Sequence, residues 1–249
     1  MKINCGFEEI SKAYMSLNAD IKLHCEIVAK YTQFLYRLCM ENNLFPGMLV
    51  EKGIPIVNNA VKYHDIGLCV RDDYKKLNSS NNIIYEKHVA SGIEILEQTN
   101  VDCLIKEENM LLYQMIWCAI AHHHERYDGS GFPKKLSGNA ISPIGQMCGL
   151  CDYYDQLSSI QLYQSDLSHF DALDHIEEQS GKLFNAKDER KSMNYESIKE
   201  EKLDSCSSVM CNRITECGSE RVRAGGLIWK HCSYLRERGK CILPAEVDR

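Results

Sequence analysis

Apolar residues recur at intervals of three and four along most of the chain, the spacing that places them on one face of an α-helix. The clearest repeat runs from about Asp20 to Met40 and is carried by Leu23, Ile27, Val28, Tyr31, Leu35 and Leu38. The run from Met110 to Ala121 is almost wholly apolar and long enough for a buried helix. We find no convincing alternating run joined to a hairpin turn. The pattern therefore predicts an all-α fold.

Four further segments carry helical spacing. The first begins near Pro55, a residue suited to a first helical turn. The second contains His88, and the third follows Pro143. The last contains Phe170 and ends near Gly181. From about Ala186 the chain becomes polar. We expect one helical domain over residues 1–190 and a polar linker with a cysteine-containing tail over residues 191–249.

Composition excludes several classes of protein. With 249 residues, 44% of them hydrophobic and 26% charged, the chain can bury one substantial core. A net charge of −6 argues against a DNA-binding surface, which needs clustered Lys and Arg. The longest apolar run is too short for a membrane span, and the first residues lack a secretory signal. We therefore expect a cytoplasmic protein that contacts neither DNA nor membrane.

The 13 cysteines are odd in number and scattered, which favours reduced thiols over disulfides. The tail holds Cys206, Cys211, Cys217, Cys232 and Cys241. Their spacings do not form the paired CxxC motifs of a convincing zinc site. A small helical tail is the favoured interpretation, so a chain ending near Asn194 should keep the core intact.

Histidines and aspartates interrupt the apolar faces at five places. Each has an ordinary explanation when taken alone: a surface pair, a helix-terminal pair, a satisfied histidine or a capping cluster. Together they offer mixed imidazole and carboxylate donors without thiolate, which suit first-row metals, and they are too many for one ion. The candidate metal ligands are Asp20, His24, His64, Asp65, His88, His123, His124 and Asp152.

Three strings occur in a definite order: HDIG at 64–67, HHERYDGSGFP at 123–133, and DYYDQL at 152–157. In order and spacing they resemble the HD-GYP family of HD-domain phosphohydrolases. The resemblance covers Asp20 to Phe184. It implies a helical bundle around a buried site of two or three divalent metals, iron or manganese, and hydrolysis of cyclic di-GMP.

The resemblance also implies roles for single residues. His64 and Asp65 would be catalytic, with Asp65 bridging two metals. Gly131, Phe132 and Pro133 stand at the GYP signature and would bind substrate. Arg126, which is close to this loop in the sequence, and Asp155 are further candidates for substrate binding. Asp155 has a second interpretation, as a residue that supports a metal ligand or helix packing. A metal pair is independently suited to phosphodiester hydrolysis, because it activates water and stabilises the leaving oxygen.

Three positions depart from the family, which has cations near the substrate phosphates where this chain has Leu68, Gln161 and Gln164. Each charge-assisted contact to an anion is worth about 1.5–3 kcal/mol, so the loss of these cations should weaken substrate binding. Because the hydrolytic chemistry resides in the metals, this loss should raise KM more than it lowers kcat. If Leu68 lines the phosphate site, Leu68→Lys should lower KM. Arg126, Lys134 and Lys135 flank the loop at 131–133 and are candidate replacements for the family's cations; the alternative is that they are solvated loop charges.

Three functions therefore stay open. The first is a phosphodiesterase for cyclic di-GMP. The second is an HD-type hydrolase that acts on another nucleotide or phosphate ester. The third is a catalytically weak scaffold or receptor that either receives cyclic di-GMP or contacts a diguanylate cyclase through the loop at 131–133.

Overall fold

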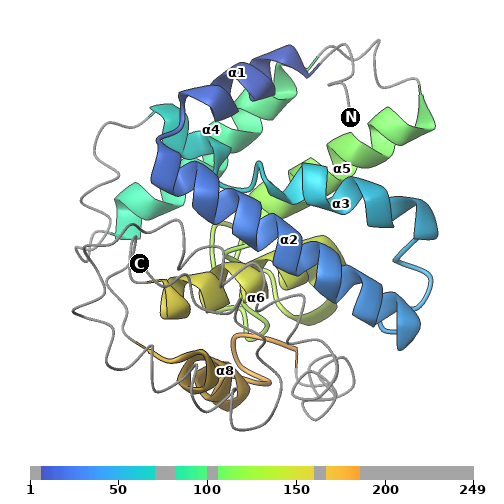
Figure 1. The fold of residues 1–249 in the computed structure, drawn as a ribbon, viewed down its shortest axis with the longest axis vertical. Coiled ribbons are helices and arrows are strands. Elements are labelled where there is room, and N and C mark those ends of the chain that lie inside the picture. Colours follow the sequence, from blue (N-terminus) through green and yellow to red (C-terminus); the bar gives the residue numbers. More distant parts are fainter. Residues whose placement is uncertain (1–6, 71–81, 100–105, 160–166, 186–249) are drawn as a thin grey trace, which may run out of the picture. The chain divides into compact units, whose positions relative to one another are not determined.

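The computed structural model describes residues 7–70, 82–99, 106–159 and 167–185 (Figure 1). Within these ranges regular secondary structure is helical, apart from an isolated bridge between Ser180 and Phe184. The all-α prediction is confirmed. The elements are α1 (Glu8–Ser16), α2 (Ala19–Glu41), η1 (Glu51–Gly53), α3 (Ile54–Val61), η2 (Ile66–Val70), α4 (Asn82–Glu97), α5 (Glu107–His122), η5 (Gly138–Ala140), α6 (Pro143–Ser158) and α8 (His169–Glu178).

Local sequence explains where the principal helices start. The Asn18 side chain accepts the Ile21 N–H at 2.7 Å, which satisfies a first-turn donor of α2. Ser142 does the same for the Gly145 N–H at 3.1 Å, and Pro143 occupies the first turn of α6. Both helices begin within a residue or so of their predicted positions.

The segment after α3 differs from the expected helix end. The helix stops at Val61, and the next four residues form turns in which the His64 N–H bonds to the Val61 carbonyl at 2.9 Å. The short 3₁₀ segment η2 follows. His64 and Asp65 therefore lie on a turn between two helical pieces, where their side chains are not held to helical spacing.

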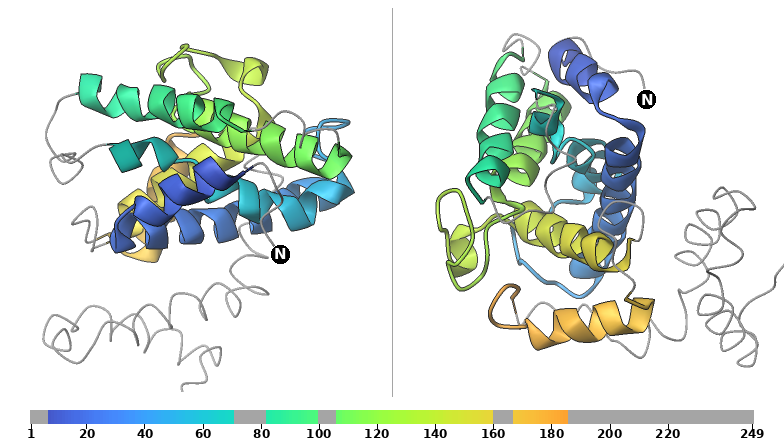
Figure 2. Two further views of the ribbon diagram at one scale, coloured as in Figure 1. Left: turned by 90° about the horizontal axis from the view of Figure 1, so that it is seen from above. Right: turned by 90° about the vertical axis from the view of Figure 1, so that its left-hand side faces the viewer.

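Four helices form the centre of the fold. α2 packs against α3 and α6, and α5 packs against the same two helices (Figure 1). α1 contacts η2 and α4, while α8 lies against α6 (Figure 2). The central core contains fully buried apolar side chains from all four helices, among them Val28, Val57, Ile116, Ile120 and Cys148. All of the predicted ligands except His88, which lies on α4, come from these four helices or from the turns that directly follow them.

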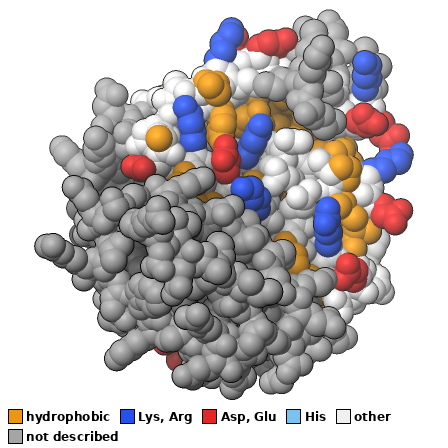
Figure 3. Space-filling model, viewed as in Figure 1, with side chains coloured by type: hydrophobic (Ala, Val, Ile, Leu, Met, Phe, Trp, Pro, Cys, Tyr) orange, Lys and Arg blue, Asp and Glu red, His pale blue; other side chains and the backbone are white. Residues whose placement is uncertain are grey.

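The part of the described surface that Figure 3 shows is mixed in charge. On the face shown in Figure 3, lysine and arginine side chains alternate with acidic ones around small apolar areas. None of the described helices combines the length and the apolar character needed to cross a bilayer. The predicted tail after residue 190 lies outside the described residues, and its interpretation stays a prediction.

Candidate metal centre

Seven of the eight predicted ligands converge in the interior. They come from α2, from the turn after α3, from α4, from the end of α5 and from α6, and each has at most 7% of its surface exposed. They are His24, His64, Asp65, His88, His123, His124 and Asp152. Burying so many polar groups is costly unless they pair with one another or bind a cation.

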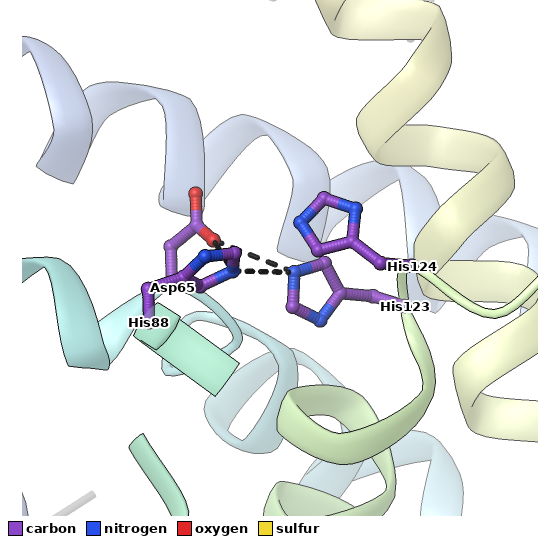
Figure 4. Close-up of side chains that lie close together, drawn as sticks. All are labelled: Asp65, His88, His123 and His124. Carbon is purple, nitrogen blue, oxygen red and sulfur yellow. Dashed lines mark hydrogen bonds and ion pairs between the residues drawn. The ribbon is translucent and has the colours of Figure 1, made fainter. Parts of the chain in front are cut away.

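Asp65 lies between two sets of histidines. Its Oδ1 is 3.3 Å from His88 Nε2 and 3.4 Å from His123 Nε2, and these two nitrogens are 3.3 Å apart (Figure 4). With His124 added, the four residues offer ligand atoms within 4.8 Å of one another. One carboxylate oxygen therefore belongs to a compact three-histidine group.

The other oxygen of Asp65 faces a second group. Oδ2 is 3.5 Å from His64 Nε2 and 3.8 Å from His24 Nε2. His24 Nε2 is also 3.1 Å from Asp152 Oδ1. His24, His64 and Asp152 again bring ligand atoms within 4.8 Å. Asp65 is thus the residue shared by both groups, which is the position expected of a bridging carboxylate.

Hydrogen bonds on the opposite ring nitrogen orient the imidazoles. His123 Nδ1 lies 2.8 Å from the Ala119 carbonyl, and His64 Nδ1 lies 3.1 Å from the Val61 carbonyl. Since a carbonyl can only accept, each Nδ1 carries the proton, and Nε2 keeps its lone pair. Such backbone contacts fix both the tautomer and the direction of a metal-binding histidine.

Asp155 performs the same role for His24. Its Oδ2 is 2.6 Å from His24 Nδ1, and its side chain is almost fully buried. This contact fits the second interpretation of Asp155, as support for a ligand. Burial lowers the pKa of His24, but its hydrogen bonds to Asp152 and Asp155 outweigh this and raise the pKa to about 10. A cation in this group would replace the proton on Nε2.

The pKa shifts of Asp65 and His64 favour the protonation states that bind a cation. Burial raises the pKa of Asp65, yet the surrounding histidines His64, His123 and His88 hold it well below its usual value. Burial lowers the pKa of His64 to about 4, which keeps its imidazole neutral near pH 7. Among the described residues, the buried His64 Nε2 has no hydrogen-bond partner. An anionic carboxylate beside neutral imidazole lone pairs fits a divalent first-row metal.

Two glycines let the helices approach closely enough to form the centre. A Cβ on Gly67 would lie 1.9 Å from the His88 carbonyl oxygen, so η2 reaches α4 only without a side chain. A Cβ on Gly149 would lie 2.4 Å from the carbonyl oxygen of His123. These contacts set the distance of His88 and His123 from the rest of the centre.

The loop after α5 is anchored to the centre. The Phe132 ring stacks on His124 with 4.5 Å between ring centroids, and the Phe132 N–H bonds to the His124 carbonyl at 3.2 Å. A Cβ on Gly131 would lie 2.4 Å from the Arg126 backbone nitrogen, so this position requires glycine. The structure therefore brings the predicted substrate residues Gly131 and Phe132 beside a candidate ligand.

Glu125 holds the same loop, although no role was predicted for it from the sequence. Its buried carboxylate accepts the Lys134 N–H and the Leu136 N–H, both at 2.8 Å. Its place in the HHE string is the signal that could have pointed to it, because a buried carboxylate needs donors. Glu125 fixes the loop without belonging to the candidate ligand groups.

We expect Glu125→Gln to destabilise the protein by about 1.5–3 kcal/mol, since a neutral amide presents a donor to one of two backbone N–H groups. Chemical denaturation measures the change. The matched control is Glu108→Gln, which makes the same substitution on the exposed first turn of α5. Equal stability of both variants would contradict the anchoring role.

Arg126 also contacts the backbone at the end of α5. Its guanidinium donates to the carbonyl oxygens of His123 at 3.0 Å and Glu125 at 3.2 Å. It also lies over the Phe184 ring, 5.8 Å from the ring centroid. These contacts give Arg126 a structural role beside a candidate ligand, and its contact with substrate stays a prediction.

Two expectations need correction. Asp20 is exposed on the first turn of α2 and belongs to neither ligand group, because its side chain lies at the surface while His24, one turn later, lies in the interior. Leu68 is only 6% exposed and packs with Leu17, Ile21 and Cys25, so it does not line an open phosphate site. Gln161, Gln164 and the tail cysteines lie outside the described residues.

Comparison with known proteins shows which family of sequences the chain matches. Residues 60–187 match the sequence model of the HD domain family. The chain is 29% identical over 183 residues to a 3'3'-cGAMP-specific phosphodiesterase 2 of Vibrio cholerae, covering 72% of this chain and 32% of that protein. It is 29% identical over 141 residues to the cyclic di-GMP phosphodiesterase response regulator RpfG of Xanthomonas campestris, covering 55% and 35%. The chain thus spans about a third of the length of these curated relatives.

Proposed function

The chain belongs to the HD domain family, and from this premise we propose that it is a metal-dependent phosphodiesterase of the HD-GYP type that hydrolyses a cyclic dinucleotide. The observation that carries the proposal is the position of Asp65, whose two oxygens face two separate groups of histidines. A carboxylate shared in this way suits a pair of ions more than a single one.

Each of the two ions would be held by its own group of residues, with Asp65 shared between them. His88, His123 and His124 form one group, and His24, His64 and Asp152 form the other. When bound, a metal pair supplies an activated hydroxide and stabilises the charge that develops on phosphate oxygens. Imidazole and carboxylate donors suit iron or manganese. Asp155 and the carbonyls of Ala119 and Val61 hold the protons on Nδ1, so that each Nε2 stays directed at the centre.

The substrate class is proposed from the relatives and from the loop beside His124. The relatives are named for two cyclic dinucleotides, 3'3'-cGAMP and cyclic di-GMP. Phe132 places an aromatic ring at the edge of the centre, and Gly131 and Pro133 would shape the same surface. Cyclic di-GMP is our first choice of substrate. The buried Leu68, in place of the family's cation, favours a second candidate: an HD-type hydrolase for another nucleotide or phosphate ester.

The test combines metal analysis with turnover of three substrates. Purified protein should contain about two divalent ions per chain and hydrolyse cyclic di-GMP, with 3'3'-cGAMP and a generic phosphodiester measured beside it. Turnover of the generic ester alone would support the shifted hydrolase. Bound metal without any turnover would support the scaffold or receptor, and protein that takes up no metal under any loading condition would contradict the proposal.

A further inference from the structure

A cysteine lies beside the candidate centre. Cys25 follows His24 on α2, is fully buried, and packs with Leu17 and Leu68. Its sulfur also lies within 4.8 Å of ligand atoms of His64 and Asp65, which are themselves within that distance of each other. The sequence predicts a donor set without thiolate.

A second observation at the same place points to a bound cation. His64 is fully buried, and within the part of the chain that the structure describes its Nε2 has no hydrogen-bond partner. Its Nδ1 is already committed to the Val61 carbonyl. A buried imidazole nitrogen with a free lone pair is costly unless a proton donor or a metal satisfies it.

We propose that Cys25 is a sulfur ligand of the metal held by His64 and Asp65, and that it shifts this position toward thiophilic ions such as zinc and cobalt and away from manganese. The inference rests on the proposed metal centre. Binding forms one metal–sulfur bond and releases the thiol proton to the buffer. Soft thiolate ligands favour zinc, whereas carboxylate and water ligands suit manganese.

The geometry is compatible with this role. Zinc–sulfur bonds are about 2.3 Å and zinc–nitrogen bonds about 2.0–2.1 Å, so two ligand atoms on one tetrahedral ion lie roughly 3.5 Å apart. Separations within 4.8 Å can close to that value by small side-chain movements. The ordinary alternative is that Cys25 acts only as a small apolar side chain.

Cobalt(II) spectra distinguish these roles in the full-length protein. The d–d bands report that the ion is bound, and a near-ultraviolet sulfur-to-cobalt charge-transfer band reports a thiolate ligand. Cys25→Ala should keep d–d bands and lose charge-transfer intensity. Cys39→Ala is the matched control, because Cys39 is a buried cysteine on the same helix that belongs to none of the candidate groups among the described residues. It should leave both bands unchanged.

Metal competition provides a second readout. Cys25→Ala should lower the preference for zinc over manganese by at least about tenfold, the size of effect seen when supporting groups at metal sites are removed. If the alanine variant does not fold, Cys25→Ser is measured instead. Charge-transfer intensity equal to that of the wild type would overturn the role of Cys25 while leaving the metal centre intact. Absence of d–d bands in the wild type would overturn the metal centre itself.

Discussion

Replacing Asp65 by asparagine is expected to remove bound metal and to reduce phosphodiester turnover at least about 10³-fold. The amide keeps the volume of the side chain but has one acceptor oxygen, so it cannot serve both histidine groups. The metals are expected to supply several kcal/mol of transition-state stabilisation, and about 4 kcal/mol corresponds to that factor. Losing bound ions also removes the stability that they give to the folded state. Metal content per chain and initial rates measure the effect.

The matched control is Asp174→Asn, which removes the same charge from an exposed position on α8. It should keep its metal and its activity. The same measurement on Asp20→Asn should also give normal metal content, because Asp20 belongs to neither ligand group. Normal metal content and turnover in Asp65→Asn would sink the assignment of the centre.

Leu68→Lys is expected to destabilise the protein by about 3 kcal/mol or more, instead of restoring a phosphate contact. Leu68 is buried with Leu17, Ile21 and Cys25. The change loses about 1.5–3 kcal/mol of apolar burial, and it adds the cost of bringing an ammonium group into an apolar cluster. Since a domain of this kind has about 5–15 kcal/mol of stability in total, the loss is large. Chemical denaturation measures it.

Two control variants distinguish the effect of lost apolar burial on stability from the effect of the added charge. Leu68→Met conserves volume and should cost less than about 1.5 kcal/mol. Val70→Lys places the same charge two residues later in η2, where the side chain is 63% exposed, and should change stability by no more than about 0.5 kcal/mol. A stable Leu68→Lys protein with a lower KM would show that the side chain reaches the phosphate site after all.

The sequence predicts the helices well because their apolar spacing and capping residues are local signals. The repeat from Asp20 to Met40 corresponds to α2 at Ala19–Glu41, and the run from Met110 lies within α5 at Glu107–His122. The pattern does not predict α1. Polar side chains on apolar faces also stand out against their surroundings. This contrast selects the seven residues that the structure brings together, but it also selects Asp20, which the structure leaves exposed.

Local signals could not supply the contacts between distant helices. The pairing of His24 with Asp155 depends on how α2 packs against α6, and so does the exposure of Asp20 at the start of α2. The burial of Leu68 depends on Leu17, which lies between α1 and α2. Spacing along one helix shows which residues share a face, but it does not show what that face meets.

The bond between His24 and Asp155 joins residues 131 positions apart. Closing so long a loop has an entropic cost that must be met before the contact contributes any stability. Long-range contacts of this kind slow folding relative to contacts within a helix. The orientation of His24 is therefore expected to be completed late in folding, after α6 has docked, so that high-affinity metal uptake would report the finished fold and not an early helical intermediate.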